Sequence, residues 1–134
     1  MTQALQDRLD VGDLFARLSD LLDERRFEDA GTVYHPSVEV HSPRGDLHGL
    51  ETVITRLSAT SPADVRTQHV HGDIQVRVDG DRAEATANQL VYFYRDGEPP
   101  HTSAGLRSSS IAVRTADGWR ITRMTITRRW QREH

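Results

Sequence analysis

Histidines are the residues of this sequence best suited to chemistry, and seven occur among its 134 residues. His69 and His71 are two positions apart, so in a regular β-strand both imidazoles point to the same face. Such a pair can bind a metal ion, or either ring can take up and return a proton near neutral pH. Asp73 is the only carboxylate nearby on that face, which disfavours the metal hypothesis.

The composition excludes several kinds of chemistry and of partner. The chain has no cysteine and no lysine, so a disulfide, a thiol nucleophile and a lysine Schiff base are all ruled out. Its net charge of -3 gives no electrostatic footprint for nucleic acid. No apolar run approaches the ~20 residues that span a bilayer, and residues 1–7 lack the features of a signal peptide. We expect a cytoplasmic protein without nucleic-acid or membrane partners.

The first half of the chain has helical periodicity. Apolar residues at three- and four-residue spacing predict a helix from about Ala4 to Glu24. A short second helix is expected from Phe27 to about Tyr34, because His35 precedes a proline and avoids the α region. Then follow a short strand over 38–41, a turn over 42–46 and a third helix from Gly49 to about residue 58. The apolar stripe of the first helix consists of Val11, Leu14, Phe15, Leu18, Leu21 and Leu22.

From Arg66 onward the periodicity changes to two, which is typical of β-strands. Turn residues at 79–81, 96–100 and 117–118 divide this half into four long antiparallel strands, the last ending near Trp130. Strands of this length must twist and curl. The order predicts a single α+β domain over 1–134. We expect about three helices to pack on a strongly curved antiparallel sheet that encloses an apolar, ligand-sized pocket.

Four segments carry a family resemblance. Residues 78–83 and 117–121 are hairpin sequences, residues 22–23 close the first helix, and residues 66–69 open the first long strand. Over roughly residues 8–130 the chain resembles the SnoaL-like branch of the nuclear transport factor 2-like superfamily. The Arg66-Thr67-Gln68-His69 strand is similar to the one that carries the catalytic histidine in scytalone dehydratase. The resemblance implies a cone-shaped fold and a homodimer formed through the open face of the sheet.

The same resemblance implies a catalytic pair made of Asp23 and His69. In the related enzymes the aspartate orients and charges the histidine, which removes a proton next to an activating group. The pair is expected within about 3 Å of each other. Leu22 stands where scytalone dehydratase has a tyrosine. On an ideal helical wheel Asp23 lies roughly 130° from the centre of the apolar stripe, which instead predicts a solvent-facing side chain.

Four further residues are predicted to bind the substrate. Tyr92 and Tyr94 suit the polarisation of a carbonyl or hydroxyl group, although parity allows either this pair or Phe93 to face inward. Tyr94 aligns nearest the second histidine of scytalone dehydratase, and Ser109 nearest its asparagine. His41 is expected at the mouth of the pocket.

These residues lead to three hypotheses for function. The first is a dehydratase, isomerase or cyclase that needs no cofactor and acts on an apolar, carbonyl-bearing small molecule, in specialised, polyketide-like metabolism. The second is a ligand-binding or assembly module of the same fold without chemistry, which predicts Asp23 in solvent. The third is a metal-dependent enzyme that uses His69 and His71.

Overall fold

The computed structural model describes residues 2–134, so Met1 of the predicted domain lies outside the described residues. It confirms an α+β fold with helices first and long strands last. Within the described part, no helix is long and apolar enough to cross a membrane. The elements are α1 (Gln3–Asp23), the 3-10 helix η1 (Phe27–Thr32), β1 (Tyr34–Ser42), β2 (Gly45–His48), α2 (Leu50–Ala59), β3 (Arg66–Asp79), β4 (Arg82–Tyr94), β5 (Thr102–Thr115) and β6 (Gly118–Glu133).

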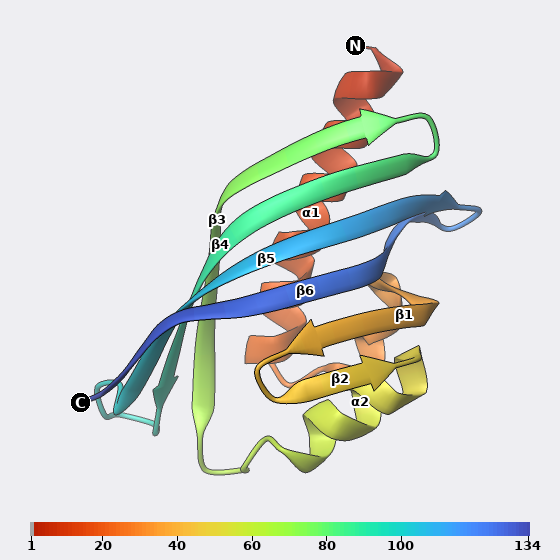
Figure 1. Cartoon of the computed structure of the whole chain (residues 1–134). Coiled ribbons are helices and arrows are strands. Elements are labelled where there is room, and N and C mark those ends of the chain that lie inside the picture. The colour runs from red at the N-terminus through yellow and green to blue at the C-terminus, as the bar shows by residue number, and fades with distance from the viewer. Residues whose placement is uncertain (1) are drawn as a thin grey trace.

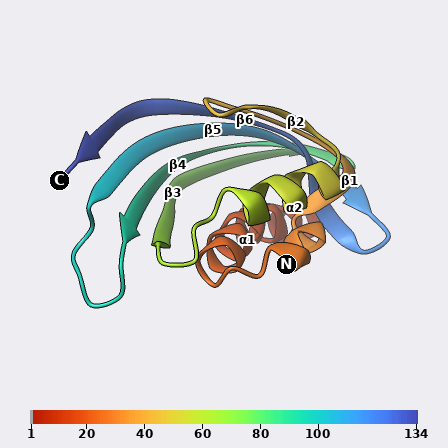
Figure 2. The same ribbon diagram turned by 90° about the horizontal axis from the view of Figure 1, so that it is seen from below.

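The six strands form one sheet in the order β2-β1-β6-β5-β4-β3. The sheet arches over α1 and α2, which cover one of its faces, and its outer face carries no helix (Figures 1 and 2). The prediction of a wholly antiparallel sheet is wrong at one place, because β1 pairs with β6 in parallel. The chain makes β2, α2 and three further strands between these two partners, and alternation within a strand does not reveal such a long-range pairing.

The core lies between α1 and the inner face of the sheet. Phe15 and Leu14 of α1 are fully buried, and Ala83, Ala85 and Ala87 alternate along β4 opposite them. Small side chains on the strand allow the helix to pack close to the sheet. As a result α1 lies along the inner side of β3, the edge strand that carries both histidines.

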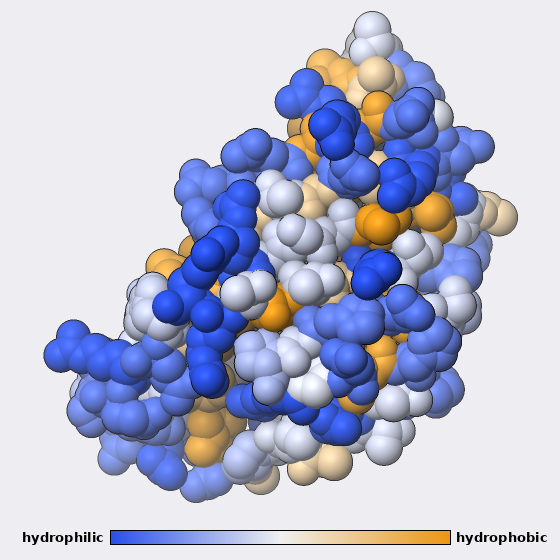
Figure 3. Space-filling model, in the orientation of Figure 1, coloured by the Kyte–Doolittle hydropathy of each residue, from blue (hydrophilic) through white to orange (hydrophobic). Residues whose placement is uncertain are grey.

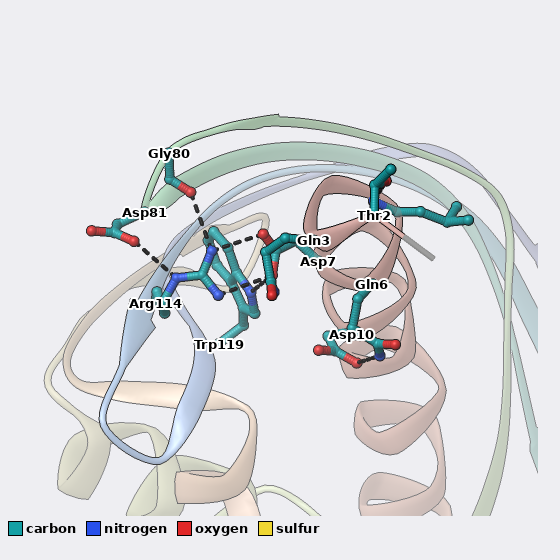
Figure 4. Close-up of polar contacts among 10 residues, drawn as sticks. Thr2, Gln3, Gln6, Asp7, Asp10, Gly80, Asp81, Arg114 and Trp119 are labelled. Atoms are coloured by element: carbon teal, nitrogen blue, oxygen red, sulfur yellow. Dashed lines mark hydrogen bonds and ion pairs between the residues drawn. The ribbon is translucent and has the colours of Figure 1, made fainter.

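A buried ion pair fixes the N-terminal part of α1 (Figure 4). The Asp7 carboxylate is almost fully buried and accepts two hydrogen bonds from the Arg114 guanidinium, at 2.9 and 2.7 Å, and one from Trp119 Nε1 at 3.2 Å. Arg114 also donates to Asp81 at 2.8 Å. The cluster therefore ties α1 to the β3–β4 turn and to both strands of the β5–β6 hairpin. The Arg114 guanidinium holds the pKa of Asp7 well below its usual range, although burial acts in the opposite direction.

Candidate functional site

Asp23 and His69 meet where α1 ends beside β3. Asp23 Oδ1 lies 2.6 Å from His69 Nδ1. The same carboxylate accepts the backbone N–H of His69, at 3.1 Å to Oδ1 and 2.9 Å to Oδ2, and the Thr67 hydroxyl at 3.0 Å. Because these donors converge on one carboxylate, its position and the orientation of the imidazole are both fixed.

The edge position of β3 explains why the strand meets the helix end here. His69 is opposite Val91 of β4, and its backbone N–H donates to Asp23 on the α1 side. The carboxylate thus satisfies a donor of an edge strand that would otherwise need water. The helical-wheel prediction that Asp23 faces solvent is wrong, since its side chain is only 20% exposed. A wheel built on the apolar stripe ignores β3, which lies along the flank of α1.

The contact with Asp23 determines which nitrogen of His69 is free. A carboxylate only accepts hydrogen bonds, so Nδ1 carries a proton, and in the neutral form of the imidazole the lone pair is then at Nε2. Within residues 2–134 Nε2 has no hydrogen-bond partner, and it is not among the buried unpaired atoms. A histidine in this state can accept a proton at Nε2, and the carboxylate then stabilises the imidazolium that forms.

Ser19 and His71 form a second pair directly beside the first. Ser19 Oγ lies 2.5 Å from His71 Nδ1, and the Phe15 ring packs on the imidazole with 5.6 Å between ring centroids. Phe15, Ser19 and Asp23 follow one another at one-turn intervals along the same face of α1. Burial, and then the charge of His69, lower the pKa of His71 to about 4, whereas Asp23 opposes this shift. His71 is therefore uncharged near neutral pH.

The metal hypothesis gains no support from this arrangement. His69 and His71 share a face of β3, as their spacing predicts, but each Nδ1 has its own partner on α1. In the described part of the chain, no three histidine, aspartate or glutamate side chains are grouped as metal ligands would be.

A groove of about 400 Å³ runs beside both pairs. It is open to solvent and mixes polar with apolar side chains, so it differs from the enclosed apolar pocket that the sequence predicts. The large apolar side chains of α1 fill the space under the sheet, which leaves the open volume at the β3 edge. The groove is lined by Ala16, Ser19, Asp20 and Asp23 of α1 and by His69, Val70, His71 and Ile74 of β3.

The other four predicted binding residues do not reach this groove. His69 is opposite Val91, so parity turns Phe93 inward and Tyr92 and Tyr94 to the outer face. Ser109 is exposed between two buried serines. Ser109 pairs with Thr125 of β6, and Thr125 pairs with His41 of β1, so all three side chains point to the outer face. On that face His41 Nδ1 lies 3.0 Å from Asp46 Oδ1.

Two residues of the site were not predicted as such, although sequence signals for both exist. Ser19 precedes Asp23 by one helical turn, and Thr67 precedes His69 by one strand repeat. Each therefore shares a face with a member of the pair. A search for polar residues at these two spacings finds both.

The fold defines a class of protein. Helices followed by a six-stranded mixed sheet form the nuclear transport factor 2-like fold, which a solved structure of that superfamily from Salmonella enterica shares at a TM-score of 0.81 and 15% identity, over 92% of this chain and 91% of that one. The model of the SnoaL-like domain family matches residues 3–125. The chain therefore belongs to the SnoaL-like family.

Known relatives support the fold but do not supply a reaction. An uncharacterized protein of Mycobacterium tuberculosis (strain H37Rv) is 29% identical over 96% of this chain and 89% of its own length. A solved structure from Kribbella flavida shares 25% identity at a TM-score of 0.88, covering 97% of this chain and 95% of that one. A hexachlorocyclohexane dehydrochlorinase from Novosphingobium barchaimii is 13% identical at a TM-score of 0.83, over 97% and 91% of the two chains.

A protein from Novosphingobium aromaticivorans, named provisionally as a scytalone dehydratase, is 16% identical at a TM-score of 0.84. The similarity covers 97% of this chain and 89% of that one. At such identities the last two comparisons establish the shared fold alone.

Proposed function

We propose that the protein is a cofactor-independent acid/base enzyme, a dehydratase, isomerase or cyclase. Its proposed substrates are apolar, carbonyl-bearing small molecules of the polyketide type. The observation that carries the proposal is the 2.6 Å contact between Asp23 and His69, which leaves Nε2 of a fixed imidazole free beside the groove. The volume of the groove is within the range of small-molecule sites. The cytoplasmic location remains a prediction.

The chemistry begins when His69 Nε2 takes a proton from the carbon next to the carbonyl group. The electron pair of that C–H bond moves toward the carbonyl oxygen and forms an enolate. In a dehydration the enolate then expels a β-hydroxyl group, which receives the proton from Nε2 and leaves as water. In an isomerisation the proton returns to another carbon. Asp23 stays ionised throughout and stabilises the imidazolium.

The non-catalytic alternative makes a different prediction about Asp23. A passive binding module leaves this carboxylate in solvent, whereas here it is mostly buried and held by the histidine and the edge strand. We therefore favour the enzyme.

Hydrogen–deuterium exchange tests the proposal without knowledge of the product. The protein is incubated in D₂O with a panel of hydroxyketones and β-diketones, and deuterium incorporation next to the carbonyl is followed by mass spectrometry. We expect catalysed exchange for at least one compound, its loss in His69→Gln and its retention in Asp20→Asn. Asp20 lines the same groove but pairs with Arg26. Exchange that is faster than in the absence of protein and persists in His69→Gln refutes the proposal.

We also propose that the chain forms a homodimer through the outer face of the sheet. Figure 3 shows this face as mainly hydrophilic with scattered hydrophobic groups. One row of the sheet joins three partly exposed apolar side chains, from Val70 through Leu90 and Gly105 to Trp130. The Trp130 indole lies over Gly105, where an added Cβ would be 2.2 Å from its Nε1. These side chains form an apolar strip on the outer face that a second copy can cover.

Light scattering after gel filtration checks the dimer. Leu90→Arg puts a charge in the middle of the strip and is expected to give a monomer. Thr86→Arg, on the same strand and face but outside the strip, is expected to remain dimeric. A monomeric wild-type protein, or a dimeric Leu90→Arg, contradicts this interface.

A further inference from the structure

The Ser19–His71 pair has a buried polar atom that the fold itself does not use. His71 Nε2 is buried and has no hydrogen-bond partner within residues 2–134. Buried polar groups without partners are uncommon and costly, and a catalytic role is one of the explanations for such a group. His71 also lines the groove into which His69 presents its free nitrogen.

The hydroxyl of Ser19 indicates where His71 carries its proton. Among the described residues His71 Nδ1 is the only hydrogen-bond partner of this hydroxyl. The Ser19 O–H is satisfied when it donates to Nδ1, and a neutral imidazole then has its single N–H at Nε2. The two histidines thus have opposite tautomers. His69 keeps a lone pair at Nε2, because Nδ1–H donates to Asp23, whereas His71 presents an N–H at Nε2.

We propose that the Nε2–H of His71 donates a hydrogen bond to the substrate's carbonyl oxygen while His69 removes the neighbouring proton. This inference rests on the proposed proton-transfer function of the same groove. Two residues along a strand separate the rings by roughly 6.6 Å. This distance allows one substrate to contact both rings. Its reacting carbon can lie against His69 while the oxygen of the neighbouring carbonyl group lies against His71. Ser19 acts as a positioning residue that selects the tautomer.

The charge states fit this division of roles. The negative charge that develops on the carbonyl oxygen needs a fixed donor shielded from water. A neutral imidazole can serve as such a donor, and His71 stays neutral because burial disfavours its charged form. The Phe15 ring against its side holds the imidazole in place. With these charge states only His69 takes up the substrate's proton, and His71 does not compete for it.

Nitrogen NMR on ¹⁵N-histidine-labelled protein near neutral pH tests the tautomers before any ligand is added. We expect the Nδ1–H form for His69 and the Nε2–H form for His71. Ser19→Ala is expected to shift His71 toward the Nδ1–H form, and Ser19→Thr to keep the wild-type form. An Nδ1–H tautomer of His71 in the wild-type protein overturns the proposal, whatever the exchange assay shows.

A phenolate probe tests the hydrogen bond itself. 4-Nitrophenolate, used at about pH 8, presents an oxyanion on an apolar ring. Its binding is expected to move the His71 Nε2–H proton signal downfield, and His71→Phe is expected to weaken binding about tenfold. Ser19→Ala covers the case in which His71→Phe fails to fold, with an expected loss in the same direction.

The outcomes separate this inference from the proposed function. Binding that perturbs His69 alone, or no binding at millimolar probe, overturns the role of His71 and leaves the exchange assay to decide the Asp23–His69 chemistry. The proposed function itself is refuted by a different result, namely catalysed exchange that does not depend on His69.

Discussion

Asp23→Asn is expected to lower kcat for the proton-transfer reaction by roughly 10²–10⁴-fold while the fold is kept. The amide oxygen, at the Oδ2 position, can still accept the backbone N–H of His69. The NH₂ group takes the place of Oδ1, so it faces the Thr67 hydroxyl and His69 Nδ1, and both of these must become acceptors. This moves the imidazole proton to Nε2, and the base loses its lone pair. The measurement is steady-state kinetics on the best compound of the exchange panel, with circular dichroism as the folding check.

A double-variant comparison makes this expectation specific. His69→Gln is expected to cost about as much as Asp23→Asn, and the double variant little more than either, because both changes disable one unit. Asp20→Asn, one turn earlier on the groove, is the matched control and should stay within about twofold of the wild type. Additive losses in the double variant mean that Asp23 acts independently of His69, and the dyad mechanism fails.

The elements of this fold could be predicted because local patterns determine them. Heptad-like spacing from Val11 to Leu21 marks α1, and apolar residues at every second position over 74–78 and 83–87 mark β3 and β4. Pairing between distant segments has no such local signature. Short alternation over residues 38–41 indicates a strand, but it does not show that β1 joins β6 in parallel. The turn residues over 42–46 overlap the start of the short strand β2, which the sequence pattern therefore does not predict.

The candidate site shows the same limit. Asp23 and His69 were paired from a family resemblance, since neither periodicity nor the wheel brings a residue at the end of α1 to an edge strand. The choice between Phe93 and the two tyrosines depends on the register of β3 against β4, and one position of shift reverses it. Ser19 was accessible from spacing alone, but only a buried, unpaired Nε2 on His71 gives it a chemical role.

Asp7→Asn is expected to lower the thermal unfolding midpoint by an amount on the order of 10 °C at neutral pH. The Asp7 carboxylate is almost fully buried, and removal of its charge leaves Arg114 without its most enclosed partner. Asp81 bonds the same guanidinium but is 83% exposed, so Asp81→Asn is the matched control with a shift of a few degrees at most. Equal shifts for the two variants contradict a special role for the buried pair.

The pH dependence of this difference follows from the direction of the pKa shift. Arg114 holds the pKa of Asp7 in the folded protein below its value of about 3.9 in the unfolded chain. The carboxylate therefore contributes its full stability above about pH 5, and the contribution is lost as the pH falls toward the folded-state pKa.

Asparagine cannot titrate, so the gap between the wild-type and Asp7→Asn midpoints should be constant from about pH 5 to 8. It should then narrow steadily below pH 4. Unfolding curves of both proteins between pH 2 and 8 measure the gap, and a gap that is independent of pH means that the ion pair with Arg114 does not carry the effect.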